Sequence, residues 1–106
     1  MRTISQYLEF QEIINQDEIV IVKFFADWCP DCTRMDMWID PIVDEYNEYT
    51  WYKINRDQVP EAATENDVMG IPSILLFKNG EKLAHLHSAN AKTPESVKAF
   101  LKENIQ

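Results

Sequence analysis

The sequence predicts an α/β domain in which helices cover both faces of a mixed β-sheet. Three observations indicate this fold class: a near-continuous apolar run at residues 19–25, a strand–turn–strand pattern at residues 73–87, and helical segments around and between them. An apolar run rich in β-branched residues is typical of a central strand that is covered on both sides. Elements in this mixed order pack as a sheet between layers of helices.

The first half of the chain predicts helix, strand and helix. Thr3 with Gln6 fits a capping box, and the apolar face of the helix that follows is expected at Ile4, Tyr7, Leu8 and Ile14. The strand at residues 19–25 leads into a long helix that starts at a pair of cysteines and reaches about Tyr49. We expect Pro41 to kink or break this helix, because proline has no backbone N–H.

The second half predicts strand, helix, hairpin and helix, which gives a sheet of about four strands. A strand is expected at residues 51–55 and a short helix at residues 61–67. Strands at residues 73–78 and 83–87 flank Asn79-Gly80, a favoured hairpin turn. Thr93 is the expected N-cap of the last helix and Pro94 its first residue, with an apolar face at Val97, Phe100, Leu101 and Ile105.

A single domain over residues 1–106 is expected, with an acidic surface. The 106 residues, 45% of them apolar, suffice to bury a core, and no linker or repeat divides them. The formal charge of −8 argues against binding to nucleic acids or anionic membranes. No apolar run approaches the ~20 residues of a membrane span, and the N-terminus has no secretory-signal pattern. We therefore expect a cytoplasmic protein.

Cys29 and Cys32 are the only cysteines of the chain. Two residues between them let both thiols lie at the start of a helix, close enough to form a disulfide. Unpaired N–H groups and the helix dipole at this end favour a thiolate, which lowers the thiol pKa from its free value of ~8.5. The first cysteine then becomes a nucleophile, and the second can attack the resulting mixed disulfide. The sequence thus predicts dithiol–disulfide exchange.

Five segments carry a resemblance to a known family, at residues 22–32, 44–46, 53–55, 70–73 and 77–81. They include Trp-Cys-Pro-Asp-Cys after an apolar strand, Gly-Ile-Pro-Ser some forty residues later, and a Lys-Asn-Gly hairpin. With them the chain resembles the thioredoxin family over essentially its whole length, and most of all short bacterial thioredoxin-like proteins. The resemblance implies a thioredoxin fold and a thiol–disulfide oxidoreductase.

The resemblance also implies roles for the residues around the cysteines. Cys29 would be the exposed attacking cysteine and Cys32 the shielded resolving one. Pro72 would follow a cis peptide bond that faces the disulfide, and the Ile71 backbone would pair with an extended substrate; a trans Pro72 at the start of a strand is the alternative. The substrate-binding residues are then expected to be Trp28, Pro30, Asp31, Ile71, Pro72, His87 and Ser88.

Lys23 departs from the family, since it falls where the family has a buried acid beneath the resolving cysteine. The family pairs that acid with a lysine that aligns with Lys53, so two lysines would meet here, which is costly if both are buried. We expect the Lys23 stem to pack while its head reaches water. The alternatives are a neutral lysine, compensation by Asp27 or Asp57, or a lysine that relays a proton to Cys32 or stabilises its thiolate.

Asp31 is a second departure, because a carboxylate between the cysteines opposes thiolate formation. It should raise the Cys29 pKa, whereas Lys23 should act the other way, so Lys23, Asp31 and Lys53 are the expected pKa-modulating residues. Asp31 also suits the first turn of a helix on structural grounds alone. An acidic row, expected to be a solvated helix face or a means of selecting partners by charge, follows at Asp36, Asp40 and Asp44.

His87 and Ser88 are the third departure, since they lie where the family has an apolar residue and glycine lining the docking groove. They are expected to change the groove's shape and charge. His85 is expected to face solvent on an edge strand. The two histidines could in principle join Cys29 and Cys32 in a zinc site, but we expect no metal, because an exchange site would have to break that geometry.

These observations together predict a monomeric, cofactor-free thiol–disulfide oxidoreductase. Its substrates would be disulfide-containing proteins or small-thiol disulfides, and its electron donor a thioredoxin-reductase-like protein or a low-molecular-weight thiol. One alternative is a specialised reductase of low-molecular-weight disulfides or of disulfides between proteins and small thiols. The other is a redox-inactive binding or zinc module.

Overall fold

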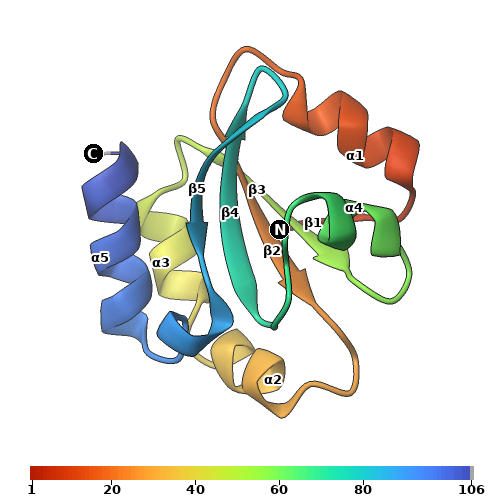
Figure 1. Cartoon of the computed structure of the whole chain (residues 1–106). Helices are drawn as coiled ribbons and strands as arrows, with labels where there is room; N and C mark the ends of the chain where they lie inside the picture. Colours follow the sequence, from red (N-terminus) through yellow and green to blue (C-terminus); the bar gives the residue numbers. More distant parts are fainter. Residues whose placement is uncertain (106) are drawn as a thin grey trace.

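A five-stranded mixed sheet separates two layers of helices in the computed structural model, which describes residues 1–105 (Figure 1). The strands run in the spatial order β1-β3-β2-β4-β5. β3 is parallel to both β1 and β2, whereas β4 is antiparallel to β2 and β5 is antiparallel to β4. Their bounds are β1 Arg2–Ile4, β2 Val20–Phe25, β3 Thr50–Asn55, β4 Ser73–Lys78 and β5 Glu81–Leu86.

The helices divide between the two faces of the sheet, as the sequence predicted. α1 and α4 cover one face, and α2, α3 and α5 cover the other (Figure 1). Their bounds are α1 Tyr7–Ile14, α2 Pro30–Asp36, α3 Asp40–Glu45, α4 Pro60–Glu65 and α5 Pro94–Ile105, with a 3₁₀ turn, η1, at Ser88–Asn90. None of these helices, within residues 1–105, is long and apolar enough to cross a membrane.

β2 is the central strand that the apolar run predicted. Val22 and Phe24 are fully buried in the core beneath α1 and α4, and Ile21 is fully buried in the core beneath α2, α3 and α5. Because successive side chains of a strand alternate between faces, Lys23 shares the face of Ile21. A lysine therefore lies in a row of buried side chains, so its ammonium group requires a partner nearby.

The prediction for residues 2–6 was wrong, because they begin with a strand and not with a helix. β1 pairs with β3 and places Ile4, which is fully buried, beside Ile54. The helix starts only at Tyr7, Thr3 does not cap it, and Leu8 is 64% exposed. A strand of three residues is too short to show an alternating pattern, so Ile4 was assigned to the helical face that follows.

The long helix after the cysteines breaks before Pro41, as expected. α2 ends at Asp36 and α3 begins at Asp40, because Pro41 can occupy the first turn of a helix but not its interior. α3 ends at Glu45 and does not reach Tyr49, whose hydroxyl instead donates to the Ile105 carbonyl at 2.7 Å.

The hairpin and the last helix form as predicted. Asn79 and Gly80 have φ angles of 54° and 80°, which fit the turn expected for this pair. β5 begins at Glu81, two residues before the predicted start. The Thr93 hydroxyl accepts a hydrogen bond from the Ser96 N–H at 3.2 Å, so Thr93 caps α5.

Candidate active site

Cys29 and Cys32 form a disulfide where the chain leaves β2 and enters α2. Cys29 is the N-cap of α2 and Pro30 is its first residue, so the short span between the cysteines has the helical start predicted for it. Their Cα atoms are 5.2 Å apart. The backbone N–H of Cys32 donates to Cys29 Sγ at 3.1 Å. An N–H at this position stabilises negative charge on Cys29 Sγ once the disulfide is reduced.

The segment before β4 faces the disulfide, because the start of β4 pairs with the end of β2. The Ile71–Pro72 peptide bond is cis, as the resemblance implied, and the Ile71 carbonyl oxygen lies 3.7 Å from Cys29 Sγ. A Cβ on Gly70 would collide with the Ser88 hydroxyl and lie 3.2 Å from Ser88 Cβ. Ser88 therefore packs against this segment, close to the disulfide, and Gly70 is required for that approach.

Trp28 is held beside the disulfide with its ring in solvent. It is 64% exposed, and its indole N–H donates to Asp57 Oδ2 at 2.7 Å. Asp57 follows β3, where its backbone N–H donates to the Asn55 side chain at 2.8 Å. Asp57 thus orients Trp28, and the carboxylate that pairs with Lys23 belongs to another residue, so Asp57 does not provide the compensation considered from the sequence.

The exposure of the two cysteines does not separate their roles. Both are 3% exposed in the disulfide form, so the expectation of one exposed and one shielded cysteine is not met. The difference lies in their polar contacts. Cys29 receives the N–H of Cys32 and lies against the Ile71 carbonyl, whereas Cys32 belongs to the first turn of α2.

Asp31 is not an isolated anion between the cysteines. Its carboxylate binds Lys92 Nζ at 2.8 Å and Arg34 at 3.1 Å. The hydrogen bond and the charge of Lys92 hold the pKa of the Asp31 carboxyl below its usual value. These two cations offset its effect on the nearby sulfurs. The sequence could not reveal the Lys92 contact, since the partners are 61 residues apart.

We predict opposite effects for removal of the two partners in this ion pair. Asp31→Asn leaves the two cations uncompensated and should lower the Cys29 thiol pKa. Lys92→Met should raise it by a similar amount, and the double variant should fall between them. Ultraviolet titration of the thiolate in the reduced proteins measures all three. Identical titrations in the three variants would mean that Asp31 does not act on the thiols.

Lys23 differs most from expectation, because its head does not reach water. It is 3% exposed, and its ammonium is paired with the carboxylate of Asp36 at the end of α2. Lys53 is its register partner on β3, and both ammonium groups lie over the Phe25 ring, 5.9 and 5.7 Å from its centroid. A hollow of about 210 Å³ opens here, lined by Met1, Lys23, Asp36, Ile39, Asp40 and Lys53.

Asp36 is therefore the counter-ion that sequence reasoning missed. We expected it on a solvated face and looked for compensation at Asp27 or Asp57. Its side chain is 63% exposed, so the solvated part of that expectation holds, yet one oxygen reaches inward to Lys23. The break before Pro41 ends α2 at Asp36, where the helix overlies Lys23 on the sheet.

His85 lies on the edge strand β5 as expected, but its side chain is only partly exposed. Its ring stacks on His87 with centroids 3.7 Å apart, its Nδ1 lies 3.2 Å from Lys82 Nζ, and its Nε2 is buried without a hydrogen-bond partner among the described residues. Burial, then the charges of His87 and Lys82, lowers the pKa of His85 to about 4. Across residues 1–105, no group of three or more His, Cys, Asp or Glu side chains is placed to hold a metal ion.

The low pKa of His85 predicts that acid destabilises the fold. In the unfolded chain this group titrates at 6.5, so the unfolded chain binds more protons than the folded one between pH 6.5 and about 4. The free energy of unfolding should fall over that range, and His85→Asn should remove about 1 kcal/mol of the fall, an amount discounted for partial exposure. Urea unfolding across pH tests this. His87→Asn is the control and should keep most of the dependence; an unchanged profile in His85→Asn would contradict the prediction.

The disulfide, closed over a short helical start and facing a backbone carbonyl, is of the kind that thiols open and remake. Fold and site therefore define a thiol–disulfide oxidoreductase. The chain belongs to the thioredoxin family, since the family model named Thioredoxin matches residues 3–103.

Individual relatives agree with this assignment. Thioredoxin-1 of Schizosaccharomyces pombe is 38% identical over 102 residues, covering 95% of this chain and 99% of the relative. Thioredoxin-1 of Saccharomyces cerevisiae is 34% identical over 96 residues, covering 91% and 90%. A solved structure of Plasmodium falciparum thioredoxin superimposes with a TM-score of 0.86 at 26% identity, covering 97% of this chain and 98% of that one. The thioredoxin fold is thus confirmed, and these relatives are eukaryotic, so they do not support the bacterial subgroup.

Proposed function

We propose that Cys29 is the attacking cysteine and Cys32 the resolving one. The Cys29 thiolate attacks one sulfur of a substrate disulfide; a mixed disulfide forms, and the other substrate sulfur leaves as a thiolate that takes up a proton. The Cys32 thiolate then attacks Cys29 Sγ, which forms the Cys29–Cys32 disulfide and releases the second substrate thiol. Two electrons pass to the substrate, and no bound cofactor is needed for this exchange.

The observation that carries this order is the hydrogen bond from the Cys32 N–H to Cys29 Sγ at 3.1 Å. In the reduced protein this donor and the start of α2 favour the thiolate of Cys29 over that of Cys32. The Ile71 carbonyl, 3.7 Å from the same sulfur, adds an acceptor that the backbone of an extended substrate can use. Both observations support Cys29 as the sulfur that attacks the incoming disulfide.

The surface around Cys29 is proposed to bind substrate through both backbone and side chains. Ile71 and Pro72 offer backbone, Trp28 an exposed ring, and Ser88 a wall against the Gly70 segment. Pro30, Asp31 and His87 complete the proposed contact residues. Lys23, Lys53 and Asp31 are proposed to modulate the thiols through their charges.

We infer that a thioredoxin-reductase-like protein or a low-molecular-weight thiol restores the dithiol. NADPH consumption, measured with a panel of thioredoxin reductases and with glutathione plus glutathione reductase, tests this. Steady consumption that requires both the protein and a disulfide substrate is expected with at least one donor. Absence of turnover with every donor, while dithiothreitol still reduces the disulfide, would contradict the proposed donors. A single-domain monomer, a cytoplasmic location and the Trp-Cys-Pro-Asp-Cys subgroup stay predictions.

A specialised reductase of small-thiol disulfides is the second candidate. It is favoured by the Ser88 side chain, which fills the space against Gly70, the residue that precedes Ile71. Rates of reduction of insulin and of a glutathionylated peptide distinguish the two functions, because a reductase specialised for small-thiol disulfides should act slowly on a bulky protein disulfide.

A further inference from the structure

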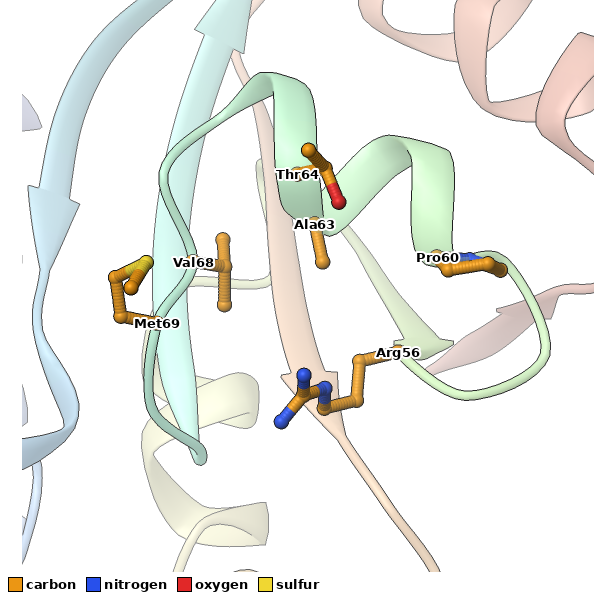
Figure 2. A pocket seen from close by; sticks show the side chains of 6 residues that line it. All are labelled: Arg56, Pro60, Ala63, Thr64, Val68 and Met69. Carbon is orange, nitrogen blue, oxygen red and sulfur yellow. The ribbon is translucent and has the colours of Figure 1, made fainter.

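A second hollow, of about 200 Å³, lies between the end of β3, helix α4 and the segment that leads to β4. It is lined by Arg56, Pro60, Ala63, Thr64, Val68 and Met69. Figure 2 shows the Arg56 side chain entering from the end of β3, with its guanidinium group directed toward the segment that carries Val68 and Met69. The other lining side chains carry no charge, so Arg56 sets the electrostatics of this hollow.

The guanidinium of Arg56 is incompletely paired. Its Nε is buried and has no hydrogen-bond partner among the described residues. The nearest carboxylate oxygen, Oδ1 of Asp57, is 4.0 Å away, and the other oxygen of Asp57 accepts from the Trp28 indole. Buried donors are normally satisfied, so an Nε that lacks a partner leaves the Arg56 cation weakly compensated beside the hollow.

Two segments connect the hollow with the region of the disulfide. The Arg56 backbone N–H donates to the Phe25 carbonyl at 2.9 Å, so the side chain starts where β2 ends and the loop to Cys29 begins. Val68 and Met69 directly precede Gly70 and Ile71, whose carbonyl faces Cys29. A substrate segment that ran from Ile71 toward Met69, which is 86% exposed and lines the hollow, would reach the hollow.

We propose that this hollow binds the carboxylate of an Asp or Glu side chain that lies near the disulfide of a peptide or protein substrate. The proposal rests on the exchange function above and adds a substrate preference to it. A guanidinium binds a carboxylate through two parallel hydrogen bonds, and the ion pair that Arg56 makes among the described residues is the long contact of 4.0 Å with Asp57. The hollow is of side-chain size, and its cation lies on a protein of net charge −8, where an acidic substrate would otherwise be repelled.

Single-turnover oxidation of the reduced protein by peptide disulfides tests this without any reductase. The probes are matched peptides that carry Glu, Gln or Lys at each position flanking the cysteine. For one position, the second-order rate constant with Glu should exceed that with Gln by about three- to tenfold, as expected for a partly exposed charged pair. Arg56→Met should reduce this ratio to about one, and Arg56→Glu should invert it in favour of Lys.

Lys98→Met is the matched control, because it removes one exposed cation on α5, away from the hollow, and should keep the Glu preference. Arg56→Lys should restore part of it, since it keeps the charge but not the fork. Equal rates for Glu and Gln peptides in the wild type, or a Glu preference that survives Arg56→Met, would overturn this inference and leave the exchange function standing. A protein that reduces none of the peptides would overturn the proposed function and the inference with it.

Discussion

Cys29→Ser is expected to abolish disulfide exchange, and Cys32→Ser to trap covalent complexes with substrates. The reason is the division of labour proposed for the two sulfurs. In Cys29→Ser the sulfur that accepts the Cys32 N–H at 3.1 Å is missing. The activated nucleophile is therefore lost, and no mixed disulfide forms. Without Cys32 the mixed disulfide forms but is not resolved. The loss of turnover should be total within measurement in both variants.

Non-reducing electrophoresis with a peptide disulfide separates the two outcomes. A covalent adduct that dithiothreitol removes should accumulate in Cys32→Ser and be absent from Cys29→Ser. The matched control is the double serine variant, which should form no adduct. If Cys29→Ser forms the adduct and Cys32→Ser does not, the proposed order of attack is reversed.

The largest effect on stability is expected at the pair of Lys23 and Asp36. Asp36→Asn removes the partner of an ammonium group that is 3% exposed, and we expect it to lower the free energy of unfolding by about 1–2 kcal/mol. The figure is below that of a fully buried pair, because Asp36 itself is 63% exposed. Lys23→Met removes the charge and keeps the packed stem, so its stability should equal or exceed that of the wild type.

The same pair is predicted to act on resolution by Cys32. Lys23→Met should slow release of the mixed disulfide and leave the first attack by Cys29 little changed, because the ammonium is proposed to support the sulfur of Cys32. Stopped-flow measurement of the two steps decides this. Equal rates in the wild type and Lys23→Met would leave the pair as a structural feature only.

Exchanging the charges of Lys23 and Asp36 tests whether stability depends on the pairing of opposite charges or on which residue stands at each position. Lys23→Asp alone places a second carboxylate beside Asp36. Although Lys53 lies nearby and would attract this carboxylate, repulsion by Asp36 should still lower the free energy of unfolding. Lys23→Asp combined with Asp36→Lys should recover at least half of that loss, because it restores an opposite-charge pair. Chemical unfolding of the single and double variants gives the coupling. Additive losses would show that the two side chains do not stabilise each other.

Local patterns predicted most of the fold and the centre of the site. The cysteines, the hairpin turn at Asn79-Gly80 and the Thr93 cap depend on neighbouring residues, so the sequence contains their signals. The disulfide at the start of α2 is the direct result of such a signal. β1 was missed for a physical reason, since three residues gain their strand character only from pairing with β3.

The charges around the site could not be predicted, because their partners come together only in the folded chain. From the sequence Lys23 has no evident partner. In the folded chain α2 ends above Lys23 and brings Asp36 into contact with it. From the sequence Asp31 is expected to disfavour the Cys29 thiolate. In the folded chain its charge is compensated by Lys92, which is 61 residues away in the sequence. Arg56 belongs to no sequence motif, so its position in the hollow between α4 and the segment before β4 could be found only from the structure.

One measurement tests the central claim most directly. The fully reduced protein is mixed with an equimolar peptide disulfide without any reductase, and thiols are counted on both molecules. We predict that the protein loses two thiols and gains an intramolecular disulfide between Cys29 and Cys32, identified by mass spectrometry, while the peptide gains two thiols. A protein that keeps both thiols while dithiothreitol reduces the same peptide would contradict the assignment as a thiol–disulfide oxidoreductase.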